Sequence, residues 1–166
     1  RSLEFFQPSQ AVKVWIDAYT AAQGLDAARS AVAAYAAKTP ERLSSQYGLA
    51  YVLRDSQDEA ARDKARNEGE MAFQQAFIEM PRNGYVWAEY ARWLNLWGQT
   101  DKAEAAAQKA LSTEPGSPGV ATAMMALSEI YAARSNATLA TQYELKAVQA
   151  EPRHPGYAPL IRGLNQ

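Results

Sequence analysis

The chain has 166 residues, of which 48% are hydrophobic and 21% charged, with 17 basic side chains against 18 acidic ones and no cysteine. This balance argues against disorder and against binding of nucleic acid or an anionic membrane through bulk charge. The lack of cysteine excludes disulfides, thiolate nucleophiles and cysteine metal sites, and no apolar run is long enough to span a membrane.

Helix-forming residues dominate the chain, above all alanine with Gln, Glu, Leu, Lys and Arg, and this predicts an all-α fold. No run of alternating β-branched and aromatic residues bounded by a two-residue turn predicts a strand. A segment with small residues at fixed offsets and a closing proline recurs with a period of thirty-odd residues. Such a period is typical of stacked helical hairpins, which bury their apolar faces only against neighbouring hairpins.

The first repeat is expected over residues 9–40. Its first helix carries an apolar stripe at the i, i+3, i+4, i+7 spacing of one helix face. The stripe comprises Val12, Trp15, Ile16 and Tyr19. Gly24 is predicted to end this helix, and Leu25 to open the second. Because a residue before proline is pushed out of the helical region, Pro40 is expected to close the repeat.

The second repeat, residues 41–81, is longer because its second helix, expected from Asp58 to Met80, begins with charged turns. Residues 58–70 carry charged side chains in nearly every turn, with Asp58 and Arg62 at the i, i+4 spacing of a favourable ion pair. One interpretation is a helix extended by two turns into solvent. The other is a protruding charged element that contacts a partner.

The third repeat spans residues 84–115 and the fourth residues 121–152, each closed by a proline. The first helix of the third repeat carries Trp87, Trp93 and Trp97, whose spacing prevents all three from facing one side. We expect two of them to pack between helix layers. Alternatively, Trp97 is partly exposed as a binding anchor, because tryptophan is favoured at interface hot spots.

The two ends of the chain are expected to cover the exposed faces of the stack. Residues 1–8 are interpreted as a linker or cap, and residues 153–166 as a C-terminal capping segment that contains the single histidine, His154. The chain opens with Arg1 and Ser2 and has no hydrophobic signal region. This favours an excised fragment over a processed mature protein.

The four repeats resemble the tetratricopeptide repeat (TPR) family over residues 9–152. The family motif is Trp-x2-Leu-Gly-x2-Tyr, followed by Ala-x3-Phe, Ala and Pro. The third repeat carries it through Trp87, Tyr90, Ala91, Leu94, Ala103, Ala107, Ala110 and Pro115. The resemblance implies a TPR-like α-α superhelix, a solenoid of four helical hairpins. Small residues are then expected where helices cross closely, at Gly48, Ala91, Ser128, Ala103 and Ala140.

In the TPR family the first helix of each repeat lines a concave surface that binds a peptide or helix of a partner. Carried over by position, the partner-binding residues are Lys13, Asp17, Gln46, Leu49, Tyr85, Glu89, Arg92, Leu96, Met125 and Glu129. One subclass clamps a C-terminal carboxylate with Lys, Asn and Arg side chains at such positions. Only Lys13 matches here, and Asp17 and Glu89 would repel a carboxylate, so no such clamp is expected.

No catalytic constellation is visible in the sequence, so the chain is not expected to be an enzyme. His154 lies alone in a proline-flanked turn, and the phosphate-binding glycine motifs and the His-Glu-x-x-His zinc motif are missing. We therefore expect no metal site and no cofactor. The triplet that begins at Asn136 matches a glycosylation sequon, but such triplets arise by chance.

The sequence therefore predicts a protein-interaction scaffold that binds a protein or peptide on its concave face, with no nucleic-acid partner and no membrane insertion of this segment. The alternative is a structural TPR region of a larger bacterial envelope, secretion, or polysaccharide or glycolipid assembly protein. In that case it packs within its own chain or as a homo-oligomer. The alanine-rich composition suggests a bacterial source, with the cytoplasm and the periplasm both open.

Overall fold

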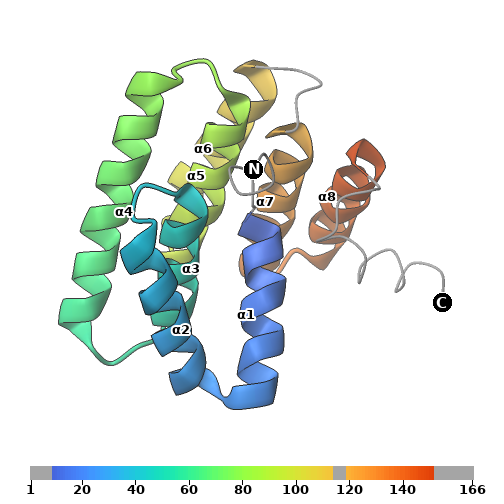
Figure 1. The fold of residues 1–166 in the computed structure, drawn as a ribbon. Coiled ribbons are helices and arrows are strands. Elements are labelled where there is room, and N and C mark those ends of the chain that lie inside the picture. Colours follow the sequence, from blue (N-terminus) through green and yellow to red (C-terminus); the bar gives the residue numbers. More distant parts are fainter. Residues whose placement is uncertain (1–8, 114–118, 152–166) are drawn as a thin grey trace. The chain divides into compact units, whose positions relative to one another are not determined.

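The computed structural model describes residues 9–113 and 119–151, which form helices and contain no strand (Figure 1). The prediction of an all-α fold of helical hairpins is confirmed. The helices are α1 (Ser9–Gln23), α2 (Leu25–Lys38), α3 (Leu43–Leu53), α4 (Glu59–Glu79), α5 (Gly84–Leu96), α6 (Thr100–Thr113), α7 (Gly119–Ala133) and α8 (Ala137–Ala150). The expected end caps, residues 1–8 and 153–166, lie outside the described residues.

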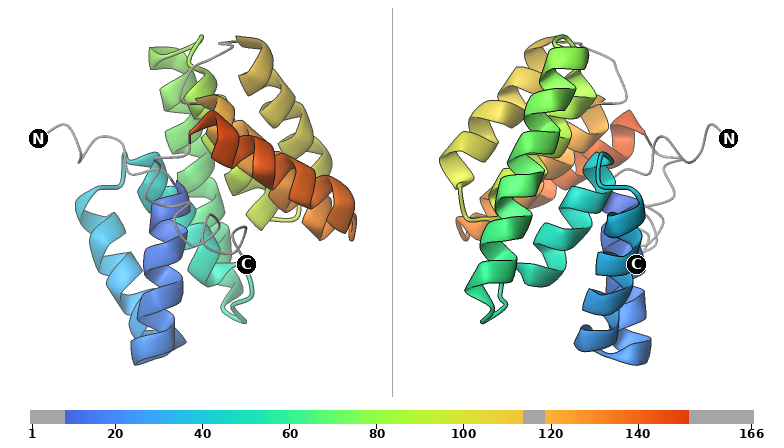
Figure 2. Two further views of the ribbon diagram at one scale, coloured as in Figure 1. Left: turned by 90° about the vertical axis from the view of Figure 1, so that its right-hand side faces the viewer. Right: turned by 60° about the vertical axis from the view of Figure 1, so that its left-hand side comes forward.

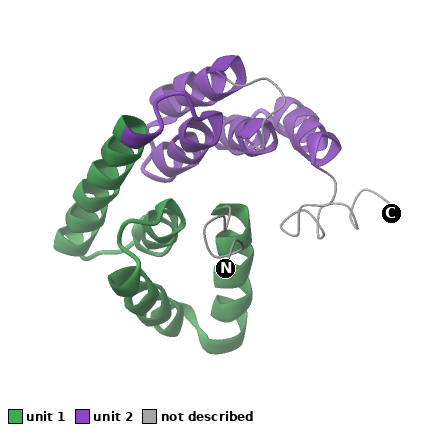
Figure 3. Cartoon of the chain, turned by 45° about the horizontal axis from the view of Figure 1, so that its top comes forward, with its two compact units in different colours: residues 1–78 green, residues 79–166 purple. Residues whose placement is uncertain are grey.

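The chain divides into two compact units, residues 1–78 and residues 79–166 (Figure 3). The first is called here the N-terminal unit and holds α1 to α4, with α4 ending one residue past the boundary. The second is called the C-terminal unit and holds α5 to α8. The finer division of residues 9–152 into four TPR-like repeats stays a prediction.

In the N-terminal unit, α1, α2 and α3 pack around a small apolar cluster of Ile16, Val32 and Val52. Gly48 of α3 lies against this cluster. A Cβ atom at Gly48 would stand 3.3 Å from a methyl of Val12 and 3.4 Å from a methyl of Val32, so a larger side chain would force the helices apart. By contrast, Trp15 is 47% exposed, so the predicted stripe on α1 is buried only in part.

Glycine and proline end the helices of the N-terminal unit where the sequence predicted. Gly24 has φ 88° and separates α1 from α2. The helix α2 ends at Lys38 and α4 ends at Glu79, each two residues before a proline. The prolines expected to close the later repeats, Pro115 and Pro152, lie outside the described part of the chain.

Helix α4 has a buried face in spite of its charged first turns. Asp58 precedes the helix, and its carboxylate accepts a hydrogen bond of 3.0 Å from the amide of Ala61, which satisfies an N–H group of the first turn. Asp58 forms no ion pair with Arg62 within the described residues. The buried face runs along the helix through Ala65, Gly69, Phe73 and Ala76. The expected extension into solvent therefore applies to the other faces only.

In the C-terminal unit, α5, α6, α7 and α8 pack side by side (Figures 1 and 2). One apolar cluster joins α5, α6 and α7 through Ala88, Ala110 and Ala123. A second joins α7 and α8 through Met125 and Ala147, with Ala121 beside them. Across both units, the residues expected at close helix crossings are all buried. They are Gly48 in the N-terminal unit and Ala91, Ser128, Ala103 and Ala140 in the C-terminal unit.

The turns after α5 and α7 share one geometry at positions 37 residues apart. After α5, the amide of Gln99 bonds to the carbonyl of Leu94 and the amide of Gly98 to that of Asn95, which is the Schellman motif. After α7, Asn136 and Ser135 repeat the pattern on earlier carbonyls of that helix. The residue in the left-handed region is Gly98 (φ 74°) in the first turn and Ser135 (φ 59°) in the second.

Substitutions in the two turns should change the free energy of unfolding in opposite directions. A left-handed conformation costs an L-residue on the order of 1 kcal/mol and costs glycine almost nothing. We expect Ser135→Gly to raise the free energy of unfolding by about 0.5–1 kcal/mol and Gly98→Ser to lower it by about 1 kcal/mol. Urea unfolding followed by circular dichroism measures both. Shifts of the same sign in the two variants would contradict this account of the turns.

Candidate partner-binding surface

The residues predicted to bind a partner all lie on α1, α3, α5 and α7, but at different depths. Asp17 is exposed, and five others are partly buried: Lys13, Leu49, Tyr85, Leu96 and Glu129. The remaining four are buried: Gln46, Glu89, Arg92 and Met125. Position in the predicted repeat therefore placed these residues on α1, α3, α5 and α7, while the depth of each follows from its neighbours.

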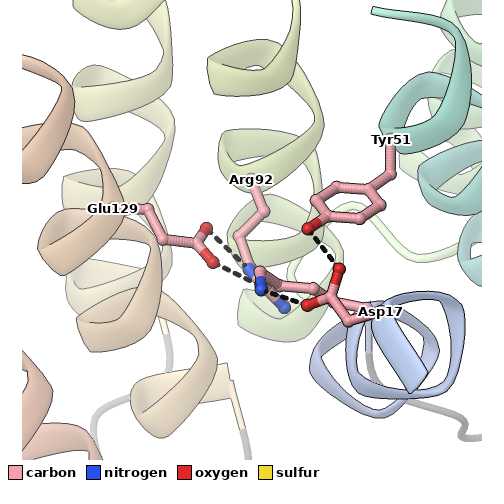
Figure 4. A network of polar contacts seen from close by, with 5 residues as sticks. Asp17, Tyr51, Arg92 and Glu129 are labelled. Atoms are coloured by element: carbon pink, nitrogen blue, oxygen red, sulfur yellow. Dashed lines mark hydrogen bonds and ion pairs between the residues drawn. The ribbon is translucent and has the colours of Figure 1, made fainter. Parts of the chain in front are cut away.

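A buried ion pair joins α5 and α7 in the C-terminal unit. Arg92 donates from Nε to Oε2 of Glu129 at 3.0 Å and from a terminal nitrogen to Oε1 at 2.5 Å. Figure 4 shows the guanidinium and the carboxylate facing each other along both bonds. The Arg92 side chain is fully buried, while Glu129 keeps 25% of its side chain exposed. Such a bidentate pair defines orientation as well as attraction.

Tyr85 and Glu89 extend this polar cluster along α5. The Tyr85 hydroxyl is hydrogen-bonded to Glu89, and burial, followed by the charge of Glu89, raises the pKa of Tyr85 far above its usual value. Tyr85 therefore remains a neutral hydrogen-bond donor. The start of α7 closes over this end of α5, because a Cβ at Gly119 would come within 2.6 Å of the Tyr85 amide nitrogen.

A second polar cluster joins α1 and α3 in the N-terminal unit. Asp17 accepts a hydrogen bond of 2.7 Å from Lys13. It accepts another of 2.7 Å from the Tyr51 hydroxyl, which Figure 4 shows. The Lys13 ammonium lies 5.4 Å from the centre of the Tyr51 ring, and the Arg54 guanidinium lies 4.4 Å from it. Both distances suit a cation–π interaction. The surface here combines two cations, one carboxylate and an aromatic ring.

The pKa shifts in this cluster preserve its pattern of charge. Burial and then the hydrogen bond to Asp17 raise the pKa of Tyr51. Burial would lower the pKa of Lys13, but the hydrogen bond from Lys13 to Asp17 and the interactions with Tyr51 and Asp17 raise it overall. At neutral pH Lys13 is therefore protonated and Tyr51 is neutral.

Three of the predicted residues support the fold. The Gln46 side-chain amide donates a hydrogen bond of 2.7 Å to the carbonyl of Pro40, which ties the start of α3 to the turn before it. Met125 belongs to the apolar cluster between α7 and α8. Leu49 packs against the cluster around Ile16. Their contribution to partner binding would be indirect.

Sequence reasoning missed a third polar cluster, between α6 and α7. Arg134 bonds to Glu104 at 2.5 Å and to Asp101 at 2.7 Å, and the Tyr131 hydroxyl donates to Glu104 at 2.8 Å. The Tyr131 ring stacks on Tyr143 of α8 with centroids 5.5 Å apart. The sequence signal that could have indicated this cluster is the pair of acids at i, i+3 spacing at the start of α6, Asp101 and Glu104. Hydrogen bonds from Arg134 and Tyr131 lower the pKa of Glu104.

No protein-family model and no curated protein matches this chain. None of the helices in the described residues is both long and apolar enough to cross a membrane. In the same residues no group of three or more His, Asp or Glu side chains is placed to hold a metal ion.

The Arg92–Glu129 pair predicts strong coupling between two substitutions. Glu129→Leu leaves a buried cation and should lower the free energy of unfolding by about 3 kcal/mol, the low end for a broken buried pair. Arg92→Met should also lower it, because it leaves the Glu129 carboxylate without its partner. The double variant should cost less than the sum, with a coupling of about 1–3 kcal/mol. Urea unfolding of the four proteins measures it, and additive costs would show that the pair is not coupled.

The Glu104 cluster predicts a pH dependence of stability. The pKa of Glu104 in the folded chain lies below its usual value of 4.5, so its stabilising contribution is present above about pH 4.5 and is lost as the pH falls through the folded pKa. We expect Glu104→Gln to be less stable than the parent at pH 7, with the gap closing between about pH 5 and pH 3. Urea midpoints across this range measure the gap. A gap that stays constant would contradict the role of the carboxylate.

Proposed function

We propose that this chain is a TPR-like scaffold whose first helices hold an extended peptide or a helix of a partner protein. The observation that carries the proposal is the pairing of polar residues between successive first helices. Asp17 of α1 meets Tyr51 of α3 across 34 residues, and Arg92 of α5 meets Glu129 of α7 across 37 residues. Both separations correspond to one repeat of the expected period.

The accessible part of each pair offers polar contacts to a partner. In the N-terminal unit these are Asp17 and Lys13 beside the Tyr51 ring. In the C-terminal unit the polar contact is the exposed quarter of the Glu129 side chain, and the partly buried Leu96 adds an apolar contact. Mixed charge with isolated apolar side chains suits a peptide held by a few anchors and several polar contacts. The buried Arg92 and Glu89 would shape this surface from beneath.

Two exposed apolar side chains favour the structural alternative. Met71 is 73% exposed and Ile78 is 75% exposed, and they lie seven residues apart on one face of α4. A helix that packs against another protein surface presents apolar side chains at this spacing, and they are exposed to water when that surface is absent. In this second proposal the chain is a structural part of a larger assembly, or it associates with copies of itself.

Selection of peptides against the protein, followed by matched substitutions, tests the scaffold function. Peptides selected from a random displayed library should bind, and Asp17→Ala or Leu96→Ala should weaken them at least about tenfold, since each removes an accessible anchor. The controls are Asp63→Ala and Met71→Ala on α4, which remove a carboxylate and a large apolar side chain from a second helix. Fluorescence anisotropy with labelled peptides measures the affinities.

Two outcomes would contradict the proposals. Selected peptides that lose affinity only with the α4 controls would exclude the first helices as the binding surface. Sedimentation velocity over a wide range of concentration tests self-association in parallel. A protein that stays monomeric throughout would exclude the homo-oligomeric form of the alternative.

A further inference from the structure

An open depression lies between α5 and α6 in the C-terminal unit, on residues that the proposed scaffold surface does not use. Its volume is about 390 Å³, at the small end of the range of about 300–1,000 Å³ found for ligand sites. The lining residues are Trp87, Tyr90 and Leu94 of α5 and Lys102, Ala105, Ala106 and Lys109 of α6. The depression thus combines an apolar floor with two cations.

The apolar floor is built by one face of α5. Trp87, Tyr90 and Leu94 follow one another at i, i+3 and i+7, which places them on one stripe. Trp87 and Tyr90 are partly buried, and their rings meet edge to face with centroids 6.4 Å apart. The facing residues of α6, Ala105 and Ala106, have small side chains and leave the space open. An apolar side chain inserted here would contact aromatic walls of the kind enriched at interface hot spots.

The rim of the depression is cationic. Lys102 and Lys109 are exposed and stand seven residues apart, about 10 Å along the axis of α6. The acids of the same helix, Asp101 and Glu104, bond to Arg134. Within the described residues neither lysine forms an ion pair. The charge of both lysines is therefore available to carboxylates of a ligand.

The depression and the scaffold surface occupy opposite faces of α5. At about 100° per residue, Trp87 and Leu94 lie about 140–160° around the helix axis from Glu89 and Arg92. Substitutions in one set therefore leave the other set in place. The two surfaces can be tested separately.

We propose that this depression docks an acidic amphipathic helix from a partner protein. The helix lies along α6, inserts a large apolar side chain between Trp87 and Ala105, and sets carboxylates against Lys102 and Lys109. Because both partners are α-helices, the carboxylates stand seven residues apart with the apolar anchor midway between them. The whole chain is nearly neutral, with 17 basic and 18 acidic residues, so the preference for acidic partners comes from this local pair of lysines.

A designed peptide tests the proposal directly. The probe is a fluorescein-labelled helical peptide of Ala and Gln, with two glutamates seven residues apart and a pair of leucines midway between them. It should bind the full chain, measured by fluorescence anisotropy. The variant Lys102→Glu with Lys109→Glu should weaken binding at least about tenfold, and added salt should weaken binding to the parent. A probe with lysines in place of its glutamates should bind that variant better than it binds the parent.

Matched controls separate this docking site from general attraction. Lys38→Glu with Lys146→Glu makes the same change in net charge on α2 and α8 and should leave binding unchanged. A probe with alanines in place of the leucines should bind at least about tenfold more weakly.

The proposal is overturned if the original probe does not bind, or if the control pair weakens its binding as much. It is also overturned if the leucine-free probe binds equally well, or if sedimentation velocity shows that a second copy of this chain binds in place of the probe. Asp17→Ala and Leu96→Ala, which test the scaffold surface, should leave this probe unaffected.

Discussion

Close approach of helices through very small side chains is the constraint on which the rest of the structure depends. More than half of the buried apolar residues in the described chain are alanines. Each buried methyl or methylene contributes only about 0.8 kcal/mol of transfer free energy. The helices must therefore lie close enough for their backbones and the few large side chains to make up the packing. Gly48 and Gly119 mark places where even one added carbon would press on a neighbour.

An alanine-rich interior also explains where the polar clusters lie. Small residues bring α5 and α7 near enough for Arg92 to reach Glu129, and long side chains then span the remaining space. A buried ion pair adds little net stability, because removing two charges from water offsets most of their attraction. Its effect is on geometry, since a shift of one helix along the other would separate the two bonded groups. The pair thus defines the register that small apolar contacts alone leave loosely specified.

The helices could be predicted from the sequence, but the burial of their individual side chains could not. Gly24, Pro40 and Pro81 act through their own backbone preferences, so local reasoning found the ends of those helices. The charged first turns of α4 were expected to extend into solvent because Ala65 and Gly69 carry almost no hydrophobic signal among charged neighbours, yet both are buried. Carrying positions over from a repeat motif placed Glu89 and Arg92 on a first helix. It could not show how closely α7 would cover them, because that depends on contacts between distant segments.

Helix α5 presents different chemistry on opposite faces, and this has consequences for ligands that bind to either. One face is joined to α7 by the buried Arg92–Glu129 pair, and the other forms the floor of the depression with α6. Coupling between two ligands requires an element with two arrangements that both ligands bias. Alanine contacts on α5, at Ala88 and Ala91, oppose such a change, because sliding the helix would break the ion pair and open gaps in a close-packed layer. A ligand on one proposed surface would therefore leave affinity at the other unchanged, and α5 would act as a rigid partition between the two.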